Sequence, residues 1–412
     1  MREFKKSIIT VKEYTFKSSK LLICSLCIGV LCGLLGTAFS KSVSFVTNLR
    51  SDCKWLVLLL PIGGLVSVAI YKLCRVSEYG TNDVFDSAKS EKNLPLGLIP
   101  AIFSGTVISH LFGASAGREG AALQLGGGIA SCFGKIIKAK ENLRRILVMC
   151  GMSALFSALF GTPVAACIFV IEIIMNKTCA VAFLPMFVSS AAAYKISKLL
   201  GAKHERFEFS DMPVLNLTVA LKTAIIIFAG IIVAFVFVTA VKKFKQLFAK
   251  FFKNDYLKIT VGGALITILT YAVGVTDYNG GGIDVIDRIF STGSVRYEAF
   301  ALKILFTAVT IAAGYKGGEI IPTLFIGATY GGALSLLLGM PPAFGAAVGI
   351  AVLFSCVTKC PVATVFLCIE MLNLDTGGVL LITAASVIAF FFSRYKGIYN
   401  NTVNLDLKSL EI

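Results

Sequence analysis

The sequence is poor in charge and almost free of histidine. Asp, Glu, Lys and Arg make up 15% of its 412 residues, whereas soluble domains average about 25%. The two histidines, His110 and His204, are far apart, and no CxxC motif has a second one to pair with. The sequence therefore argues against a metal site built from Cys and His, and the 12 cysteines are interpreted as small buried apolar residues.

Motifs of common enzyme classes are also missing. The chain contains no HExxH and no GxSxG. Its glycine-rich stretch GGGIASCFGKII fails as a phosphate loop, because Ile129 stands where a Gly is required and Ile136 where a Ser or Thr is required. We therefore expect no enzymatic activity and no cofactor.

Long apolar runs, in contrast, follow one another along the whole chain. The composition is 56% hydrophobic and the mean hydropathy is +0.83. A membrane-spanning helix needs about 20 apolar residues, and several runs reach that length while others are shorter or broken by Gly and Pro. The sequence predicts an all-α polytopic membrane protein, with apolar runs near 21–39, 55–74, 98–113, 145–175, 180–200, 214–241, 256–275, 299–314, 320–357 and 361–393.

The net charge of +16 comes from short basic segments between these runs. Examples are KKFKQLFAKFFKND at 242–255 and the N-terminal residues 1–20. Basic residues that flank membrane segments are typical of cytoplasmic loops. We therefore expect a cytoplasmic N-terminus and no nucleic-acid partner. The first apolar run is too long for a signal peptide and has no small-residue cleavage site.

An internal repeat organises the chain. TPVAACIFVIE at 162–172 matches CPVATVFLCIE at 360–370, and GREGAALQLGGGI from 117 matches GGEIIPTLFIGAT from 317. A third pair is NDVFD at 82–86 and IDVID at 283–287. Three blocks in the same order at nearly one offset indicate two homologous halves. The predicted division is an N-terminal segment 1–20, a first membrane half 21–241, a basic linker 242–255, a second membrane half 256–400 and a short tail 401–412.

Glycine clusters interrupt the apolar runs in the repeated blocks. Irregular backbone is tolerated at membrane depth only where protein or a water-filled cavity satisfies it. Duplicated transporters place their substrate where such broken helices meet, and helix N-termini attract anions. The clusters beside Glu119 and Glu319 therefore predict an anion site, while isolated glycines such as Gly64 and Gly262 are better explained by close helix packing.

Glu119 is the central candidate, because an acid among Gly, Ala and Leu in FGASAGREGAALQLGGGIAS is costly to keep. When ionised, its carboxylate is a tethered anion that can occupy a site for anions. When protonated, it vacates that site and lets a halide in, so that the competition couples one proton to anion movement. For Arg118, a structural ion pair or loop anchor is preferred to direct anion binding.

The GREG stretch resembles the glutamate loop of the CLC family of chloride channels and proton-coupled anion antiporters, which usually reads GREGP. Ala121 replaces the usual proline. The segment GYKGGEIIPTLFIGATYG resembles the matching second-half loop, and YKGIYNNT resembles the stretch that carries the anion-facing tyrosine, here Tyr399. The resemblance covers nearly all of the chain and implies two halves arranged as an inverted repeat, with broken helices meeting at a central anion site.

Three departures indicate the fluoride/proton antiporter branch of this family, CLC-F. The first loop reads YGTNDV, with Thr81 and Asn82 in place of the chloride-coordinating serine. Ile173 stands where many chloride/proton exchangers carry a second proton-transfer glutamate. Glu319 lies in the second-half loop, where it is a candidate proton relay, the alternative being a structural hydrogen bond to loop amides.

The resemblance thus implies export of fluoride from the cytoplasm in exchange for protons by a multi-pass protein of the plasma membrane, with the family's homodimeric assembly. The alternative is a chloride channel or chloride/proton exchanger of the same fold.

Fluoride is a strong hydrogen-bond acceptor, so backbone N–H, amide, hydroxyl and phenol donors suit it. A positive aromatic edge also suits it, although packing is the commoner role for any one of the 32 Phe residues. Glu172 and Glu370 are interpreted as structural or capping groups. The candidate anion-binding residues are Thr81, Asn82, Phe85, Gly117, Arg118, Gly120, Gly318, Ile320, Ile321 and Tyr399.

Overall fold

Every regular element in the described part of the chain is a helix. The structure, a computed structural model, describes residues 2–90, 93–175, 179–208, 213–214, 216–393, 395 and 397–399. The elements in chain order are α1 (Arg2–Asp52), η1 (Lys54–Leu59), α2 (Leu60–Leu73), α3 (Thr81–Lys89), α4 (Leu98–Phe112), α5 (Glu119–Ile136), α6 (Glu141–Phe160), α7 (Pro163–Ile174), α8 (Cys179–Leu199), α9 (Leu217–Phe251), α10 (Asp255–Val273), α11 (Ile283–Thr292), α12 (Ala299–Ala313), α13 (Ile320–Leu337), α14 (Pro342–Thr358), α15 (Pro361–Leu372) and α16 (Thr376–Phe392).

The predicted all-α membrane architecture is confirmed. Six helices among the described residues are long and apolar enough to cross a membrane, and six more are apolar but only 10–17 residues long. Large apolar side chains are exposed along the outer helices, for example Leu217 at 77% on α9 and Leu380 at 67% on α16. In water such a surface would be unfavourable, whereas lipid tails cover it at no cost.

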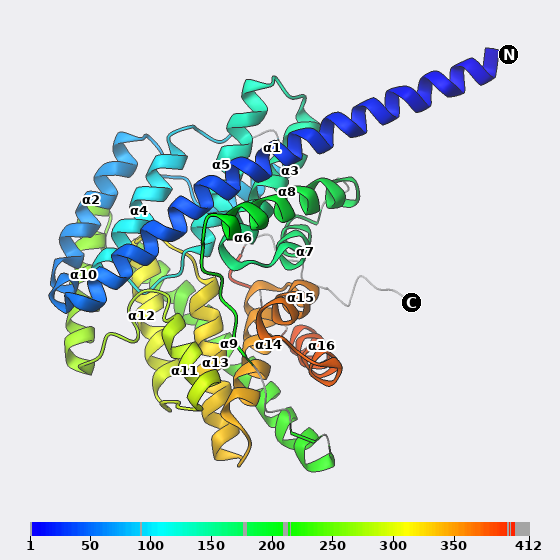
Figure 1. Ribbon diagram of the computed structural model, residues 1–412. Coiled ribbons are helices and arrows are strands. Elements are labelled where there is room, and N and C mark those ends of the chain that lie inside the picture. The colour runs from blue at the N-terminus through cyan, green and yellow to red at the C-terminus, as the bar shows by residue number, and fades with distance from the viewer. Residues whose placement is uncertain are drawn as a thin grey trace.

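Figure 1 shows how the helices are arranged. Helix α1 crosses the molecule diagonally, and its N-terminal end projects beyond the other helices. Helices α2 and α10 lie together at one edge, while α15 and α16 lie at the opposite edge. The N-terminal starts of α5 and α13 are buried in the interior between these edges.

The two halves contain matched helices, as the sequence repeat predicts. Helices α4 and α12 have 15 residues each, α5 and α13 have 18 each, and α7 and α15 have 12 each. The backbone agrees in detail, since Thr162 before α7 has φ −122° and ψ 73° and Cys360 before α15 has φ −120° and ψ 74°. Equivalent sequence blocks therefore adopt equivalent local structures.

Glycines let the innermost helices approach each other at backbone distance. A Cβ on Gly126 of α5 would lie 2.1 Å from the carbonyl oxygen of Gly151 on α6. In the second half, a Cβ on Gly331 of α13 would lie 2.1 Å from the carbonyl oxygen of Gly345 on α14. Small residues drive this kind of close packing in membranes, so these two pairs hold the helices that carry the glutamate loops.

The halves also cap each other. The carboxylate of Glu172, near the end of α7, accepts hydrogen bonds of 3.0 and 2.7 Å from the two backbone N–H groups after Pro361. The carboxylate of Glu370, near the end of α15, accepts bonds of 3.2 and 2.9 Å from the two backbone N–H groups after Pro163. Each glutamate thus neutralises free N–H groups and the positive end of the partner helix, which is the capping role expected for both.

The boundary between the halves is more helical than the predicted linker suggests. Helix α9 continues without a break to Phe251, and α10 begins at Asp255. The predicted N-terminal segment 1–20 is likewise continuous with α1 from Arg2 on. The predicted tail 401–412 lies outside the described residues.

Candidate functional site

The two glycine-rich loops meet as a short antiparallel bridge. The N–H of Gly117 donates to the carbonyl of Gly318 at 2.8 Å, and the N–H of Gly318 donates to the carbonyl of Gly117 at 2.7 Å. Helix α5 starts just beyond Gly117, at Glu119, and α13 starts just beyond Gly318, at Ile320. Two helix N-termini, one from each half, therefore converge at one place, where their free N–H groups favour negative charge.

Glu119 lies at this convergence. It is the first residue of α5 and is 1% exposed. Its Oε2 accepts a hydrogen bond of 3.4 Å from the N–H of Ile321, in the first turn of α13. A Cβ on Gly117 would lie 2.1 Å from the same oxygen, so only glycine leaves room for the carboxylate. The side chain of Glu119 thus spans the two halves.

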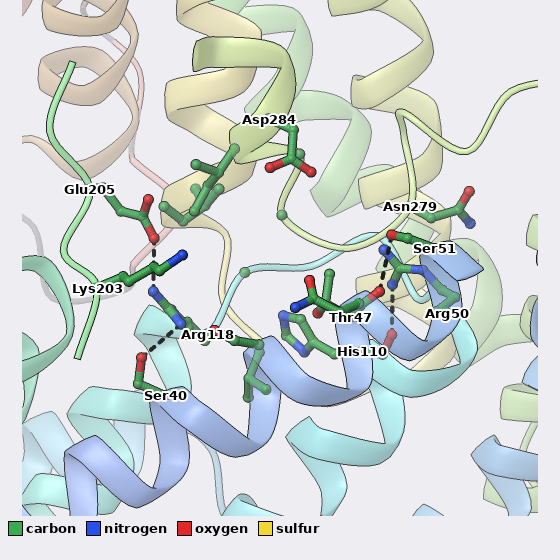
Figure 2. Close-up of a pocket in the computed structure, with 18 of the residues that line it drawn as sticks. Ser40, Thr47, Arg50, Ser51, His110, Arg118, Lys203, Glu205, Asn279 and Asp284 are labelled. Carbon is green, nitrogen blue, oxygen red and sulfur yellow. Dashed lines mark hydrogen bonds and ion pairs between the residues drawn. The ribbon is translucent and has the colours of Figure 1, made fainter. Parts of the chain in front are cut away.

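Arg118 is held in the wall of the site. One nitrogen of its guanidinium donates to Ser40 Oγ of α1 at 3.0 Å, and another pairs with Glu205 Oε1 at 2.8 Å (Figure 2). Glu205 belongs to the segment between α8 and α9. Burial raises the pKa of the Glu205 carboxyl, and the neighbouring Arg118 opposes that rise. The guanidinium therefore anchors the loop that carries Glu119.

A cavity of about 610 Å³ gives access to Glu119 from one side of the molecule. Besides Glu119, its lining includes the basic side chains of Lys41, Arg50, Arg118 and Lys203. Figure 2 shows several of these residues around the opening. Glu205, Asp277 and Asp284 also line the cavity, so its lining carries charges of both signs.

Glu319 is oriented away from that cavity. It stands at the N-cap position of α13 without a side-chain capping hydrogen bond, and one of its carboxylate oxygens lies 3.8 Å from Nζ of Lys245 in the basic end of α9. Helix α10 begins just after this basic end of α9. The segment that follows the last turn of α10, from Thr276 on, lines the same cavity as Glu119. Because the 19 residues of α10 span about 28 Å, Glu119 and Glu319 face opposite sides of the molecule.

The first-half loop begins α3. Thr81 is the first residue of that helix, and its Oγ1 accepts a hydrogen bond of 2.8 Å from Nε2 of Gln124 on α5. Oδ1 of Asn82 is buried and has no hydrogen-bond partner among the described residues. The Gln124 contact leaves the Thr81 hydroxyl proton available as a donor.

Phe85 and Tyr399 join the same region. Their rings meet edge to face, with centroids 5.4 Å apart at 86°. Phe85 is 0% and Tyr399 is 4% exposed, and the Ile398 N–H anchors this segment by donating to the carbonyl of Val357 at 2.9 Å. The phenol of Tyr399 lies within electrostatic range of both Glu119 and Glu319. The structure therefore brings α3, both glutamate loops and the segment around Tyr399 together.

Comparison with known proteins agrees with this geometry. The family model described as voltage gated chloride channel matches residues 63–394. The chain belongs to the voltage gated chloride channel family. The resemblance to CLC proteins predicted from the GREG loop is thus confirmed.

Individual members of the family align with most of the chain. A chloride/fluoride channel protein of Pseudomonas syringae pv. tomato is 30% identical over 384 residues, covering 90% of this chain and 84% of the relative. The H(+)/Cl(−) exchange transporter ClcA of Vibrio cholerae is 25% identical over 443 residues, covering 95% and 90%.

Solved structures of the family superpose over nearly the whole chain. The crystal structure of a CLC-type fluoride/proton antiporter matches with a TM-score of 0.89 and 31% identity, covering 94% of this chain and 98% of that one. A slow cyanobacterial Cl−/H+ antiporter matches with a TM-score of 0.79 and 22% identity, covering 92% and 96%. The second match shows the shared fold.

Within this family framework, several contacts could not be foreseen from the sequence. Glu205 and Ser40, which hold Arg118, and Lys245, beside Glu319, are distant in the chain and belong to no motif. Gln124 is different, because a polar residue in the apolar helix that carries Glu119 is a detectable signal.

Proposed function

We propose that this protein is a fluoride/proton antiporter, not an enzyme, and that it exports fluoride from the cytoplasm. The observation that carries the proposal is the buried carboxylate of Glu119 between the starts of α5 and α13, at the cavity of about 610 Å³. The similarity to a chloride/fluoride channel protein and to a CLC-type fluoride/proton antiporter supports it.

Glu119 is the gate and the proton carrier in this proposal. Ionised, its carboxylate accepts the Ile321 N–H and occupies the position that an anion would take. When the carboxyl group is protonated, it loses its charge and is a weaker acceptor for the Ile321 N–H. It then swings aside and an anion takes its position. Because the proton and the anion compete for one position, movement of one is tied to movement of the other.

The anion site is formed by donors from both halves. Backbone N–H groups of Gly120, Ile320 and Ile321 would supply close hydrogen bonds, as helix starts do for anions. Gly117 and Gly318 would shape the site through their bridge, because each N–H already donates to the other's carbonyl. Small, strongly accepting fluoride gains most from donors at short range.

Side-chain donors would complete the site. The hydroxyl of Thr81, the amide of Asn82 and the phenol of Tyr399 can each donate to an anion, and Phe85 would contribute its positive ring edge. Arg118 acts through the loop it anchors, because Ser40 and Glu205 engage its guanidinium.

Protons would reach the opposite side through Glu319. The two glutamates face opposite sides, which supports an inverted arrangement of the two halves. The basic end of α9 would then be cytoplasmic by the positive-inside rule, together with the N-terminus. The protein would reside in the plasma membrane as a homodimer.

Flux measurement in liposomes tests the proposal. Purified protein in fluoride-loaded vesicles should release fluoride, and an imposed fluoride gradient should drive protons uphill in the opposite direction. Fluoride efflux that ignores the proton gradient would indicate a channel. Chloride that moves as fast as fluoride would indicate a chloride channel or chloride/proton exchanger instead.

A further inference from the structure

A second, smaller cavity lies away from Glu119. Its volume is about 80 Å³, and it is lined by residues of α2, of the start of α10 and of the connection between α12 and α13. The polar lining residues are Tyr71, Ser77, Asp255, Lys258 and Lys316. A water molecule occupies about 30 Å³ in the liquid, so the cavity has room for a few particles of that size.

The cavity opens on the side opposite the Glu119 cavity. Asp255 and Lys258 belong to the first turn of α10, whereas the Glu119 cavity contains the segment that follows the last turn of α10. The small cavity is therefore on the side of the basic end of α9 and of Glu319. Its lining does not include Thr81 or Tyr399, so it is separate from the central site.

Lys316 is fixed in place in this cavity. Its backbone N–H donates to Ser109 Oγ of α4 at 3.2 Å. The phenol of the preceding residue, Tyr315, lies within hydrogen-bond distance of two backbone carbonyl acceptors. These are Leu60 O of α2 at 2.9 Å and Ile259 O of α10 at 3.2 Å. The first contact holds the backbone of Lys316 and the second holds the side chain of its neighbour, so the loop that carries the ammonium group is anchored on both α4 and the α2–α10 pair.

The ammonium of Lys316 lies over an aromatic ring. Its Nζ is 4.0 Å from the ring centroid of Tyr71, and it forms no ion pair with any carboxylate in the described part of the chain. The nearby Lys258 pairs with Asp255 at 3.0 Å. The one carboxylate of the lining therefore already has a cation, and one positive charge in excess remains.

Two buried hydroxyl groups at the same place lack partners. The phenol oxygen of Tyr71 and Oγ of Ser67, in residues 2% and 1% exposed, have no hydrogen bond among the described residues. Both side chains and Lys316 crowd around Gly105 of α4, where an added Cβ would lie 2.9 Å from the Tyr71 ring, 3.2 Å from Lys316 Cγ and 3.2 Å from Ser67 Oγ. Buried hydroxyls are rarely left unsatisfied.

We infer that this cavity is a second binding site for a small inorganic anion, a halide held by Lys316 and the hydroxyl of Tyr71. The excess positive charge and a free buried donor are what an anion requires. The site would collect the anion on the side of the basic end of α9, next to the loop that carries Glu319. This role as a loading site rests on the proposed transport function.

Calorimetric titration of the full-length protein in detergent with sodium fluoride and with sodium chloride tests this. Tyr71→Phe keeps the ring under Lys316 but removes the hydroxyl, and Lys316→Met removes the charge. Each should weaken one class of halide binding by about tenfold or more. Lys72→Met is the matched control, because Lys72 also lies over a ring, that of Tyr256 at 4.2 Å, but is exposed and outside the cavity.

The outcomes separate this inference from the proposed function. Halide binding that is the same in Tyr71→Phe, Lys316→Met and the control would mean that the cavity holds water only, and would overturn the inference even if proton-coupled flux is normal. Binding lost in both variants, with no proton-coupled flux in the unaltered protein, would keep the anion site and overturn the antiporter. Size-exclusion profiles test whether each variant is folded. If Lys316→Met is not folded, halide binding by Tyr71→Phe, compared with the control, decides the outcome.

Discussion

Gly318→Ala should disable transport although it changes neither charge nor polarity. A Cβ at Gly318 would lie 2.4 Å from the backbone nitrogen of Gly120, where ordinary contact is 3.4–4 Å. The obstacle is backbone, not a flexible side chain, so the two loops must separate by about 1 Å. That movement stretches the bridge between Gly117 and Gly318 and pulls Ile321 away from Glu119.

The size of the effect follows from this displacement. Overpacking costs about 1–3 kcal/mol, which a protein of this size tolerates as a fold. In enzymes, a misplacement of about 1 Å lowers rates on the order of 100-fold, and we expect a comparable fall in fluoride efflux. Efflux from liposomes and the apparent melting temperature in detergent measure the two quantities separately.

Gly128→Ala is the matched control for this prediction. Gly128 lies in α5, and an added Cβ would meet only the side chain of Ile99, at 3.2 Å. Alanine also favours a helix over glycine by about 1 kcal/mol, so this variant should transport normally. Normal flux in Gly318→Ala as well would refute the reasoning, because the halves would then not need their close approach.

Three further predictions concern charge and donors. Glu119→Gln should abolish proton coupling and nearly stop fluoride flux, measured in liposomes with external pH recorded; proton pumping that survives would leave Glu319 as the better carrier. Asn82→Ser and Thr81→Ser should admit more chloride, seen as a lower fluoride-to-chloride flux ratio, and an unchanged ratio in both would remove the first loop from selectivity. Glu172→Gln and Glu370→Gln should each destabilise the protein by about 2 kcal/mol, with similar drops in apparent melting temperature. A drop in only one would contradict the equivalence of the two caps.

Sequence patterns were sufficient for the architecture because membrane folding leaves strong local signals. Apolar runs predict helices, since lipid forces backbone groups to bond within a segment. The offset between the two PVA motifs predicts two halves, and α7 and α15 indeed begin at Pro163 and Pro361. The bridge between the two loops requires glycine at 117 and 318. The sequence shows these glycines only as members of clusters and does not show the bridge itself.

Long-range polar contacts were not predictable in the same way. Arg118 was expected to have a structural partner, but nothing in the chain indicated Glu205, which lies 87 residues away. The capping of α15 by Glu172 spans 190 residues. Such pairs are fixed by how helices cross in three dimensions, and side-chain spacing along one helix carries no information about them.

The repeat is not symmetric where the chemistry is proposed to occur. Glu119 accepts a hydrogen bond from Ile321 of the other half, whereas Glu319 lies 3.8 Å from Lys245 of α9 and its side chain is 14% exposed. Among the described residues, only Glu119 of these two equivalent carboxylates therefore accepts a hydrogen bond across the halves. A single crossing carboxylate gives the chain one position that the proton and the anion must both use in turn. Two such positions in series would allow a proton to pass one while an anion passes the other, and the tie between their movements would be lost.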